Sequence, residues 1–252
     1  MTDRKKTRVL IGTAAWNEGD KIALQTGHVM AFIKNRPPDE PVEFSYLLID
    51  DGSTDGAPAR LASLPGVKII RHEKTLGAGV SVREIYQEAR AQNCEIAVTI
   101  AGNAKDDPEE IPKLIQPVLE GAFDFVQGSR YLAPEPFGNM PLYRLFATKY
   151  LHPLLFSFFA RKRITDSTNG FRAVRVSLLL DTRIDLSQAW LDHYELEPYI
   201  FFKAIRLGFR VREVPVRKVY PSKVSGYTKM VPIIDWWRIL KPLFYLGLGL
   251  KK

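Results

Sequence analysis

Residues 46–55 constrain the fold most, because an apolar run ends there in a cluster of acidic and small polar residues. The run reads Tyr-Leu-Leu-Ile-Asp-Asp-Gly-Ser-Thr-Asp. Its apolar part is typical of a buried parallel strand, and ligands of open α/β sheets bind beyond the carboxyl ends of such strands. We therefore expect Asp50 and Asp51 at the rim of a crevice, accepting hydrogen bonds from ribose hydroxyls or a base N–H. The alternative is an Asp-rich turn in which Ser53 or Asp55 caps a following helix.

The segments before this run complete a βαβ unit. Residues 8–13 predict a strand, residues 14–18 form a polar break, and residues 20–34 predict a helix. A strand, a helix and a second buried strand in this order are typical of a parallel sheet. The chain is therefore expected to be an α/β protein, and its 252 residues suffice for one large domain or two small ones.

A second polar turn follows the next predicted strand, at residues 67–71. It carries Gly77 and Gly79 ahead of a helix predicted for residues 80–91. Glycine lets the backbone approach a ligand closely, which makes Gly77 a candidate ligand contact. A tight strand-to-helix turn with no ligand is the alternative, and we give it equal weight.

Charge and cysteine content narrow the classes of partner. The net charge is +8 with no nucleic-acid-binding motif, which favours an anionic membrane surface or a phosphorylated substrate and no nucleic acid. Cys94 is the single cysteine, so internal disulfides and a thiolate metal cage are excluded. Residues 1–7 are charged and lack the apolar segment of a secretory signal, so we expect a cytoplasmic location.

The order and spacing of these motifs carry a family resemblance. The chain resembles inverting family-2 glycosyltransferases of the GT-A fold, most of all the polyprenyl-phosphate (dolichol-phosphate mannose synthase-like) branch. Those enzymes begin with strand-Pro-x-Tyr-Asn-Glu and continue with strand-Asp-Asp-Gly-Ser-x-Asp. The second motif is intact here, whereas residues 14–18 read Ala-Ala-Trp-Asn-Glu, without the Pro and with Trp in place of Tyr. The resemblance covers roughly residues 8–229.

The resemblance implies a Rossmann-like, mostly parallel sheet with helices on both faces. It also implies a nucleoside diphosphate sugar as donor. The nucleotide would be held by residues of the first three strand ends: Ala14, Trp16, Glu18, Asp50, Asp51 and Gly77.

The segment after the strand predicted for residues 95–100 departs from the family pattern. Relatives carry Asp-x-Asp there, and the second acid binds a divalent metal on the diphosphate. This chain has Ala101 and Asn103 at those positions. Three interpretations compete: Asn103 still holds Mg²⁺ or Mn²⁺ with help from Asp106 or Asp107, Lys105 partly replaces the metal charge, or the site is inactive. We take Asp107 as a helix cap, leaving Asn103 and Asp106 as metal candidates, and expect metal to bind only with nucleotide.

Three residues are candidates for holding an acceptor phosphate. Arg130 lies in a Gly-Ser-Arg-Tyr motif shared with the family, where the arginine faces that phosphate. Arg144 and Thr148 are one helical turn apart and match an Arg and a Ser that join it in polyprenyl-phosphate transferases. Arginine can grip a phosphate with two hydrogen bonds. The alternative for Arg144 is a surface cation with its stem on apolar residues.

The motif at residues 166–172 reads Asp-Ser-Thr-Asn-Gly-Phe-Arg and also matches the family. The resemblance places Asp166 near the transferred sugar and a cationic loop over the diphosphate, so the predicted catalytic residues are Asp166, Arg130, Lys223 and Lys229. The predicted sugar contacts are Asn103, Thr168, Asn169, Gly170, Arg172 and Asp192. The alternative for Asp192 is an acid near a helix start. A phosphate acceptor is already anionic, so no general base is required.

Two apolar segments interrupted or closed by charges predict contact with a membrane. Residues 150–159 are too short to span a bilayer, and residues 233–250 are broken by Asp235, Arg238 and Lys241. Both suit helices lying in the interface, although residues 150–159 could instead form a buried core helix. We therefore expect a transferase domain over residues 1–229, an amphipathic extension over 230–252, and a peripheral location at the cytoplasmic face.

The predicted reaction is an inverting transfer of a sugar from a nucleoside diphosphate to a polyprenyl phosphate. One alternative is a non-catalytic domain that binds nucleotide sugar or acts as a scaffold, suggested by Ala101 and Asn103. Another is a transferase with a saccharide or alcohol acceptor. Arg144 and Thr148 argue against an alcohol acceptor, because an alcohol has no phosphate group for these side chains to bind.

Overall fold

The computed structural model describes residues 6–56, 61, 64–132, 140–220 and 233–251. A seven-stranded sheet forms its centre, in the order β3-β2-β1-β4-β6-β5-β7. The strands are β1 (Thr7–Ala15), β2 (Val42–Asp50), β3 (Val67–Arg71), β4 (Ile96–Ala101), β5 (Phe125–Ser129), β6 (Arg172–Arg175) and β7 (Val211–Pro215). β6 is antiparallel to both of its neighbours, and the other pairs are parallel. The predicted mostly parallel α/β fold is confirmed.

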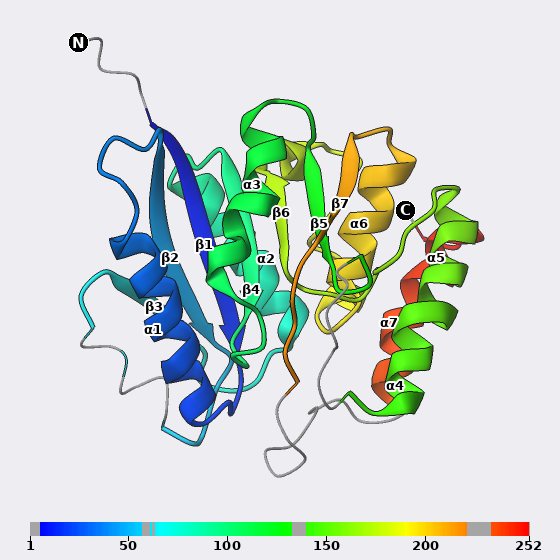
Figure 1. Ribbon diagram of the computed structural model, residues 1–252. Helices are drawn as coiled ribbons and strands as arrows, with labels where there is room; N and C mark the ends of the chain where they lie inside the picture. The colour runs from blue at the N-terminus through cyan, green and yellow to red at the C-terminus, as the bar shows by residue number, and fades with distance from the viewer. Residues whose placement is uncertain (1–5, 57–60, 62–63, 133–139, 221–232, 252) are drawn as a thin grey trace.

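Helices cover both faces of this sheet (Figure 1). The main ones are α1 (Asp20–Lys34), α2 (Ala78–Ala91), α3 (Ile111–Leu119), α4 (Leu142–Phe146), α5 (His152–Ala160), α6 (Leu196–Arg206) and α7 (Ile234–Gly247). One core packs α1 and α3 against Val9 and Ile11, and the other packs α2, α5 and α6 around Leu10 and Leu47. Side chains alternate between the faces of a strand, so neighbouring residues of β1 belong to different cores.

The register of the strands brings three strand ends to one edge. Ala14 of β1 pairs with Ile49 of β2 on one side and with Ala101 of β4 on the other. The turns after β1, β2 and β4 therefore meet at the carboxyl edge, where ligands of α/β sheets bind. Because β6 runs in the opposite direction, the turn that precedes Arg172 reaches the same edge.

Ser53 and Asp55, in the turn after β2, stabilise the turn after β1 through hydrogen bonds. Ser53 Oγ accepts a hydrogen bond from the backbone N–H of Asn17 at 2.9 Å, and Asp55 accepts one from Gly19 at 2.8 Å. Gly19 is the N-cap residue of α1, so Asp55 stabilises the start of that helix from a neighbouring loop. The alternative drawn from the sequence, a cap on the helix that follows, falls on a segment that lies mostly outside the described residues.

The C-terminal helix α7 packs against the rest of the molecule. Leu243 is fully buried, and a Cβ on Gly247 would lie 2.2 Å from the Phe159 ring, so α5 and α7 approach closely there. Lys241 Nζ lies 2.5 Å from the buried carboxylate of Glu195 just before α6. None of the helices in the described part of the chain combines the length and apolar content needed to cross a bilayer.

Candidate functional site

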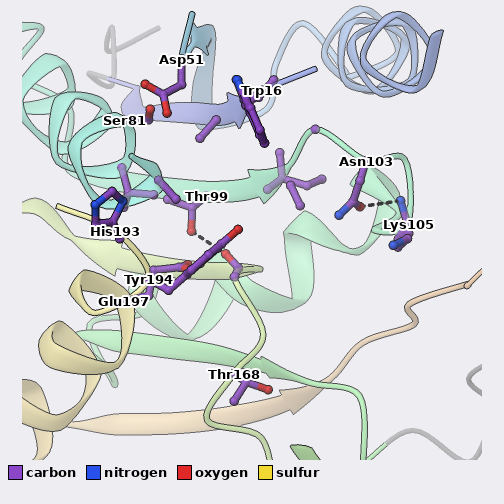
Figure 2. Close-up of a pocket in the computed structure, with 18 of the residues that line it drawn as sticks. Trp16, Asp51, Ser81, Thr99, Asn103, Lys105, Thr168, His193, Tyr194 and Glu197 are labelled. Carbon is purple, nitrogen blue, oxygen red and sulfur yellow. Dashed lines mark hydrogen bonds between the residues drawn. The ribbon is translucent and has the colours of Figure 1, made fainter. Parts of the chain in front are cut away.

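A cavity of about 580 Å³ opens at the carboxyl edge of the sheet, a volume typical of small-molecule sites. Its lining comes from the ends of β1, β2, β4 and β5, from α2 and α4, from the turn before β6, and from the start of α6, the segment after β7 and α7. Figure 2 shows part of this lining. Eleven predicted site residues line it: Ala14, Trp16, Glu18, Asp51, Gly77, Asn103, Arg130, Arg144, Thr168, Gly170 and Arg172. Those outside the lining are Asp50, Asp106, Thr148, Asp166, Asn169 and Asp192, and Lys223 and Lys229 fall outside the described residues.

The two acids after β2 have different surroundings. Asp50 is fully buried and turned into its own loop, where Oδ1 accepts from the Ser53 N–H at 2.9 Å. Asp51 lines the cavity and accepts from the N–H groups of Leu76 and Gly77 at 2.8 and 3.0 Å. Of the two, only Asp51 lines the described cavity and could contact a nucleoside there.

His72 is a residue that sequence reasoning missed, and it orients Asp51 from behind. Its Nδ1 lies 2.8 Å from Asp51 Oδ1, and its Nε2 lies 2.8 Å from a Glu84 oxygen. Burial alone would lower the pKa of His72, but the two carboxylates outweigh it and raise the pKa. The contact with the His72 ring holds the Asp51 carboxylate in place. No motif could have indicated this, because Glu84 lies twelve positions further along the chain.

Gly77 and Gly79 make room for the loop before α6. Cβ atoms at these positions would lie 2.3 Å from Asp192 O and 1.9 Å from Leu191 O, respectively. Both glycines allow close packing, and Gly77 also lines the cavity, so its contact with a ligand stays a prediction. Asp192 turns its carboxylate away to Arg83, at 2.7 Å.

The turn after β4 points a lysine into the cavity. Asn103 Oδ1 accepts from the N–H of Lys105 at 3.3 Å (Figure 2), and Ala104 between them has a φ of +55°. Lys105 is buried, with its ammonium 5.0 Å from the centre of the Tyr220 ring. Burial, followed by the charges of Arg144, Lys218 and Lys21, lowers the pKa of Lys105 to about 8.

Asp106 is held by a lysine from the distant end of the sheet. Lys218 Nζ lies 2.8 and 2.7 Å from its two carboxylate oxygens and 3.0 Å from Asn169 Oδ1. Backbone pairing between Asp106 and Lys218 joins the same segments. Asp106 and Asn169 therefore serve to position Lys218, which itself lines the cavity.

A buried ion pair links the Gly-Ser-Arg motif to the turn before β6. Arg130 Nε and Nη2 donate to the two oxygens of Asp166, both at 2.7 Å. The same guanidinium donates to Thr168 Oγ1 at 2.6 Å and to Tyr220 Oη at 3.0 Å. Asp166 is fully buried behind Arg130, so it positions the arginine while Arg130 and Thr168 face the cavity.

Arg144 and Thr148 have separate environments although they are one turn apart. Arg144 lines the cavity with its guanidinium 5.6 Å from the Tyr220 ring centre. Thr148 Oγ1 donates to the carbonyl of Arg144 at 2.8 Å and also contacts Tyr131 Oη. Tyr220, which no motif indicated, thus lies among Lys105, Arg130 and Arg144.

Further cavity residues come from α7 and the start of α6. These residues, none of them predicted from the sequence, are His193, Tyr194, Glu197, Asp235, Arg238 and Ile239. Burial, and then the charges of Asp235 and Glu197, raise the pKa of Tyr194 to about 12. Glu197 also lies 3.2 Å from the buried guanidinium of Arg172. The break of residues 233–250 by charges was the available signal, because Asp235 and Arg238 are two of those charges.

The donor set at this turn does not fit a preformed divalent metal site. Both oxygens of Asp106 are bound to Lys218, and Asn103 offers one amide oxygen that already accepts from Lys105. Within the described residues no three His, Cys, Asp or Glu side chains are grouped to hold a metal. Metals of this kind prefer several carboxylate or carbonyl oxygens, and here an ammonium lies beside the single amide.

A family model decides the classification. The model described as glycosyl transferase family 2 matches residues 15–182, more than half of the chain. The chain belongs to glycosyl transferase family 2. It is therefore a glycosyltransferase, and its sheet with a cavity at the carboxyl edge is the GT-A fold.

Curated relatives of this family-2 chain include enzymes acting on lipid phosphates. A UDP-N-acetylglucosamine–dolichyl-phosphate N-acetylglucosaminyltransferase from Methanococcus voltae is 27% identical over 218 residues, covering 78% of this chain and 84% of the relative. A polyprenol monophosphomannose synthase from Mycolicibacterium smegmatis is 28% identical over 247 residues, covering 93% and 89%.

A solved structure resembles the family-2 fold over nearly the whole chain. Glucosyl-3-phosphoglycerate synthase from Mycobacterium tuberculosis, in complex with Mn²⁺, UDP and glucosyl-3-phosphoglycerate, superposes with a TM-score of 0.64. The match covers 98% of this chain and 81% of that chain at 17% identity, so it shows the fold alone. That neighbour holds a divalent metal together with its nucleotide.

Proposed function

We propose that this glycosyltransferase moves a hexose-like sugar from a nucleoside diphosphate sugar to a polyprenyl phosphate, with inversion at the anomeric carbon. The observation that carries the proposal is the position of Arg144 and Arg130 in the same cavity as Asp51 and Trp16. One wall of the cavity suits a nucleoside, and the other offers two guanidinium groups to an anion. The names of the lipid-phosphate relatives agree with this assignment.

In the proposed reaction an oxygen of the acceptor phosphate attacks the anomeric carbon opposite the leaving group. The bond between that carbon and the diphosphate oxygen breaks, and the electron pair leaves with the diphosphate. A single displacement of this kind inverts the configuration. The acceptor is already an anion, so no side chain needs to remove a proton, and the role of Arg130 and Arg144 is to orient the phosphate.

The surface near Arg144 supports an acceptor that stays in a membrane. Large apolar side chains are exposed on α4, α5, α7 and the π-helical segment Ala147–Leu151 between α4 and α5. We call them the apolar face: Leu142, Tyr143, Phe146, Tyr150, Leu151, Leu154, Phe158, Ile234, Trp236 and Trp237. Tyr143 and Trp236 join α4 to α7, with ring centres 6.2 Å apart, and Figure 1 shows α4, α5 and α7 together at one end of the molecule. Exposed Arg161, Lys162 and Arg163 follow α5.

An exposed apolar face with aromatic and basic residues suits the interface of an anionic bilayer. We therefore propose that the enzyme binds peripherally to the cytoplasmic face of a membrane. Within the predicted extension at residues 230–252, α7 both exposes Trp237 and contributes Asp235 and Arg238 to the cavity.

The reaction is tested by transfer assays with purified protein, UDP- and GDP-sugars and a polyprenyl phosphate. We expect transfer with at least one donor, and we expect Arg144→Gln to lower kcat/KM by about tenfold to a hundredfold, as the loss of a charge-assisted hydrogen bond worth about 1.5–3 kcal/mol predicts. Arg90→Gln, on the exposed end of α2, is the control and should leave transfer unchanged. Transfer to saccharides in place of the lipid phosphate would contradict the proposed acceptor.

Membrane binding is tested by flotation with anionic liposomes at low salt. Leu154→Glu should lower the bound fraction strongly, because it places a charge where about 1.5–3 kcal/mol of apolar burial is expected. Leu154 is 69% exposed on α5, and Leu24, 53% exposed on α1, provides a matched control as Leu24→Glu. Equal flotation of the two variants would show that the apolar face does not contact the bilayer.

A further inference from the structure

Several cations gather around the turn after β4. Lys21, Lys105, Arg144 and Lys218 all line the cavity, and the charges of the other three act on Lys105. The three cations lower the pKa of Lys105, whereas the carboxylate of Glu18 raises it. Like charges brought together in a partly buried cavity repel one another, so an arrangement of this kind favours an anionic ligand.

The backbone holds Lys105 in place toward the cavity. Its carbonyl accepts from the N–H of Val219 at 3.0 Å, and its own N–H donates to Asn103. Ala104 adopts a left-handed conformation that costs a non-glycine residue about 1–2 kcal/mol. The ion pair between Lys218 and Asp106, two residues further on, stabilises the turn against this local strain.

Four carboxylates line the same cavity: Glu18, whose charge acts on Lys105, and three that make the following contacts with protein groups. Asp51 accepts from two backbone N–H groups and contacts His72. Glu197 pairs with Arg172, and Asp235 pairs with Arg238 at 2.8 Å. The residues around Asn103 therefore offer positive charge and few oxygen ligands.

We propose that the Lys105 ammonium takes the place of a divalent metal, contacting the diphosphate of the donor and stabilising the leaving nucleoside diphosphate. This inference rests on the proposed function only in taking a nucleoside diphosphate sugar as donor. Asn103 keeps the turn in shape through its bond to the Lys105 N–H, and Lys218 and Arg144 extend the positive surface.

The charge balance of the step agrees with this role. When the bond between the anomeric carbon and the diphosphate oxygen breaks, the oxygen gains the electron pair and the leaving group gains one negative charge. A fixed ammonium beside that oxygen stabilises the added charge without transferring a proton. Preorganised cations in a site shielded from water are effective for this purpose.

The test is calorimetric binding of UDP and GDP to the purified protein, first in excess EDTA and then with Mn²⁺. We expect the wild type to bind at least one of them with the same Kd within about twofold in both conditions. Lys105→Met should weaken that binding by about tenfold or more in EDTA, since a charged hydrogen bond contributes about 1.5–3 kcal/mol. Lys105→Arg keeps the charge and should retain most of the affinity.

Lys34→Met, at the exposed end of α1, is the control and should bind like the wild type. Thermal unfolding of each variant separates a binding defect from a folding defect. Loss of wild-type binding in EDTA, or tightening by tenfold or more with Mn²⁺, would overturn the proposal. Unchanged nucleotide binding by Lys105→Met would also overturn the proposal. The same holds if the wild type binds neither UDP nor GDP.

This outcome is independent of the acceptor, because the binding assay contains no lipid. A protein that binds UDP or GDP in EDTA but transfers no sugar to polyprenyl phosphate would contradict the proposed reaction alone. Transfer to polyprenyl phosphate that stops in EDTA would contradict the role of Lys105 alone.

Discussion

Arg130→Met is expected to lower the free energy of unfolding by about 3–5 kcal/mol, because it leaves a buried carboxylate without its partner. Arg130 and Asp166 are 2% and 0% exposed and are joined by two hydrogen bonds of 2.7 Å. The carboxylate and the Tyr220 ring hold the pKa of Arg130 well above its usual range, although burial acts to lower it. Thr168 and Tyr220 would also lose a donor.

Chemical denaturation measures this effect, and the chain offers a matched control. Arg210 also binds Asp124 through two hydrogen bonds, but its side chain is 56% exposed, so Arg210→Met should change stability far less. The double variant Arg130→Met/Asp166→Asn should recover part of the loss, since no charge then remains buried. Equal midpoints for Arg130→Met and Arg210→Met would refute this account of the ion pair.

Gly79→Ala is expected to destabilise the protein by about 1–3 kcal/mol or more and to weaken nucleotide binding. Alanine normally stabilises a helix relative to glycine, but here the added Cβ would lie 1.9 Å from the carbonyl oxygen of Leu191. The neighbouring atoms belong to backbone, so α2 and the loop before α6 must separate. His193 and Tyr194 of that loop line the cavity and would move with it.

Gly27→Ala tests the same substitution where space is open. Gly27 lies inside α1, and a Cβ there would meet no atom within 4 Å. This variant should gain about 0.5–1 kcal/mol from helix propensity. Thermal unfolding together with nucleotide titration would compare the two variants, and a stabilised Gly79→Ala would mean that the two segments separate at no cost.

Local patterns predicted much of the sheet and the region of the cavity. The apolar run before Asp50 identified a buried strand, and the acids at its end mark the edge where the cavity lies. Which acid faces the cavity could not be predicted, because it depends on Gly52, which adopts a φ of +71° and lies so close to the next loop that an added Cβ would be 2.5 Å from the Lys74 backbone. That contact depends on a loop from the next strand, so it leaves no trace in the local pattern.

Contacts between segments far apart in the sequence explain why other site residues differ from those predicted. Asp106 was a reasonable metal candidate from its position in the chain, but its partner Lys218 lies 112 residues away. Tyr220 and Arg238 belong to no recognised motif, and they reach the cavity only because β7 and α7 return to the same edge. A sequence shows which residues are charged, but it does not show which distant residues they contact in the fold.

The lining of the cavity comes from two stretches of chain, one before β5 and one after it. The wall with Trp16 and Asp51 is built from residues that precede β5, and the wall with Arg144 and Tyr194 is built from residues that follow it. The family model ends at residue 182, within the second stretch. Under the proposed assignment, substitutions in the later wall would change the acceptor that is used, whereas donor binding at the earlier wall would be kept.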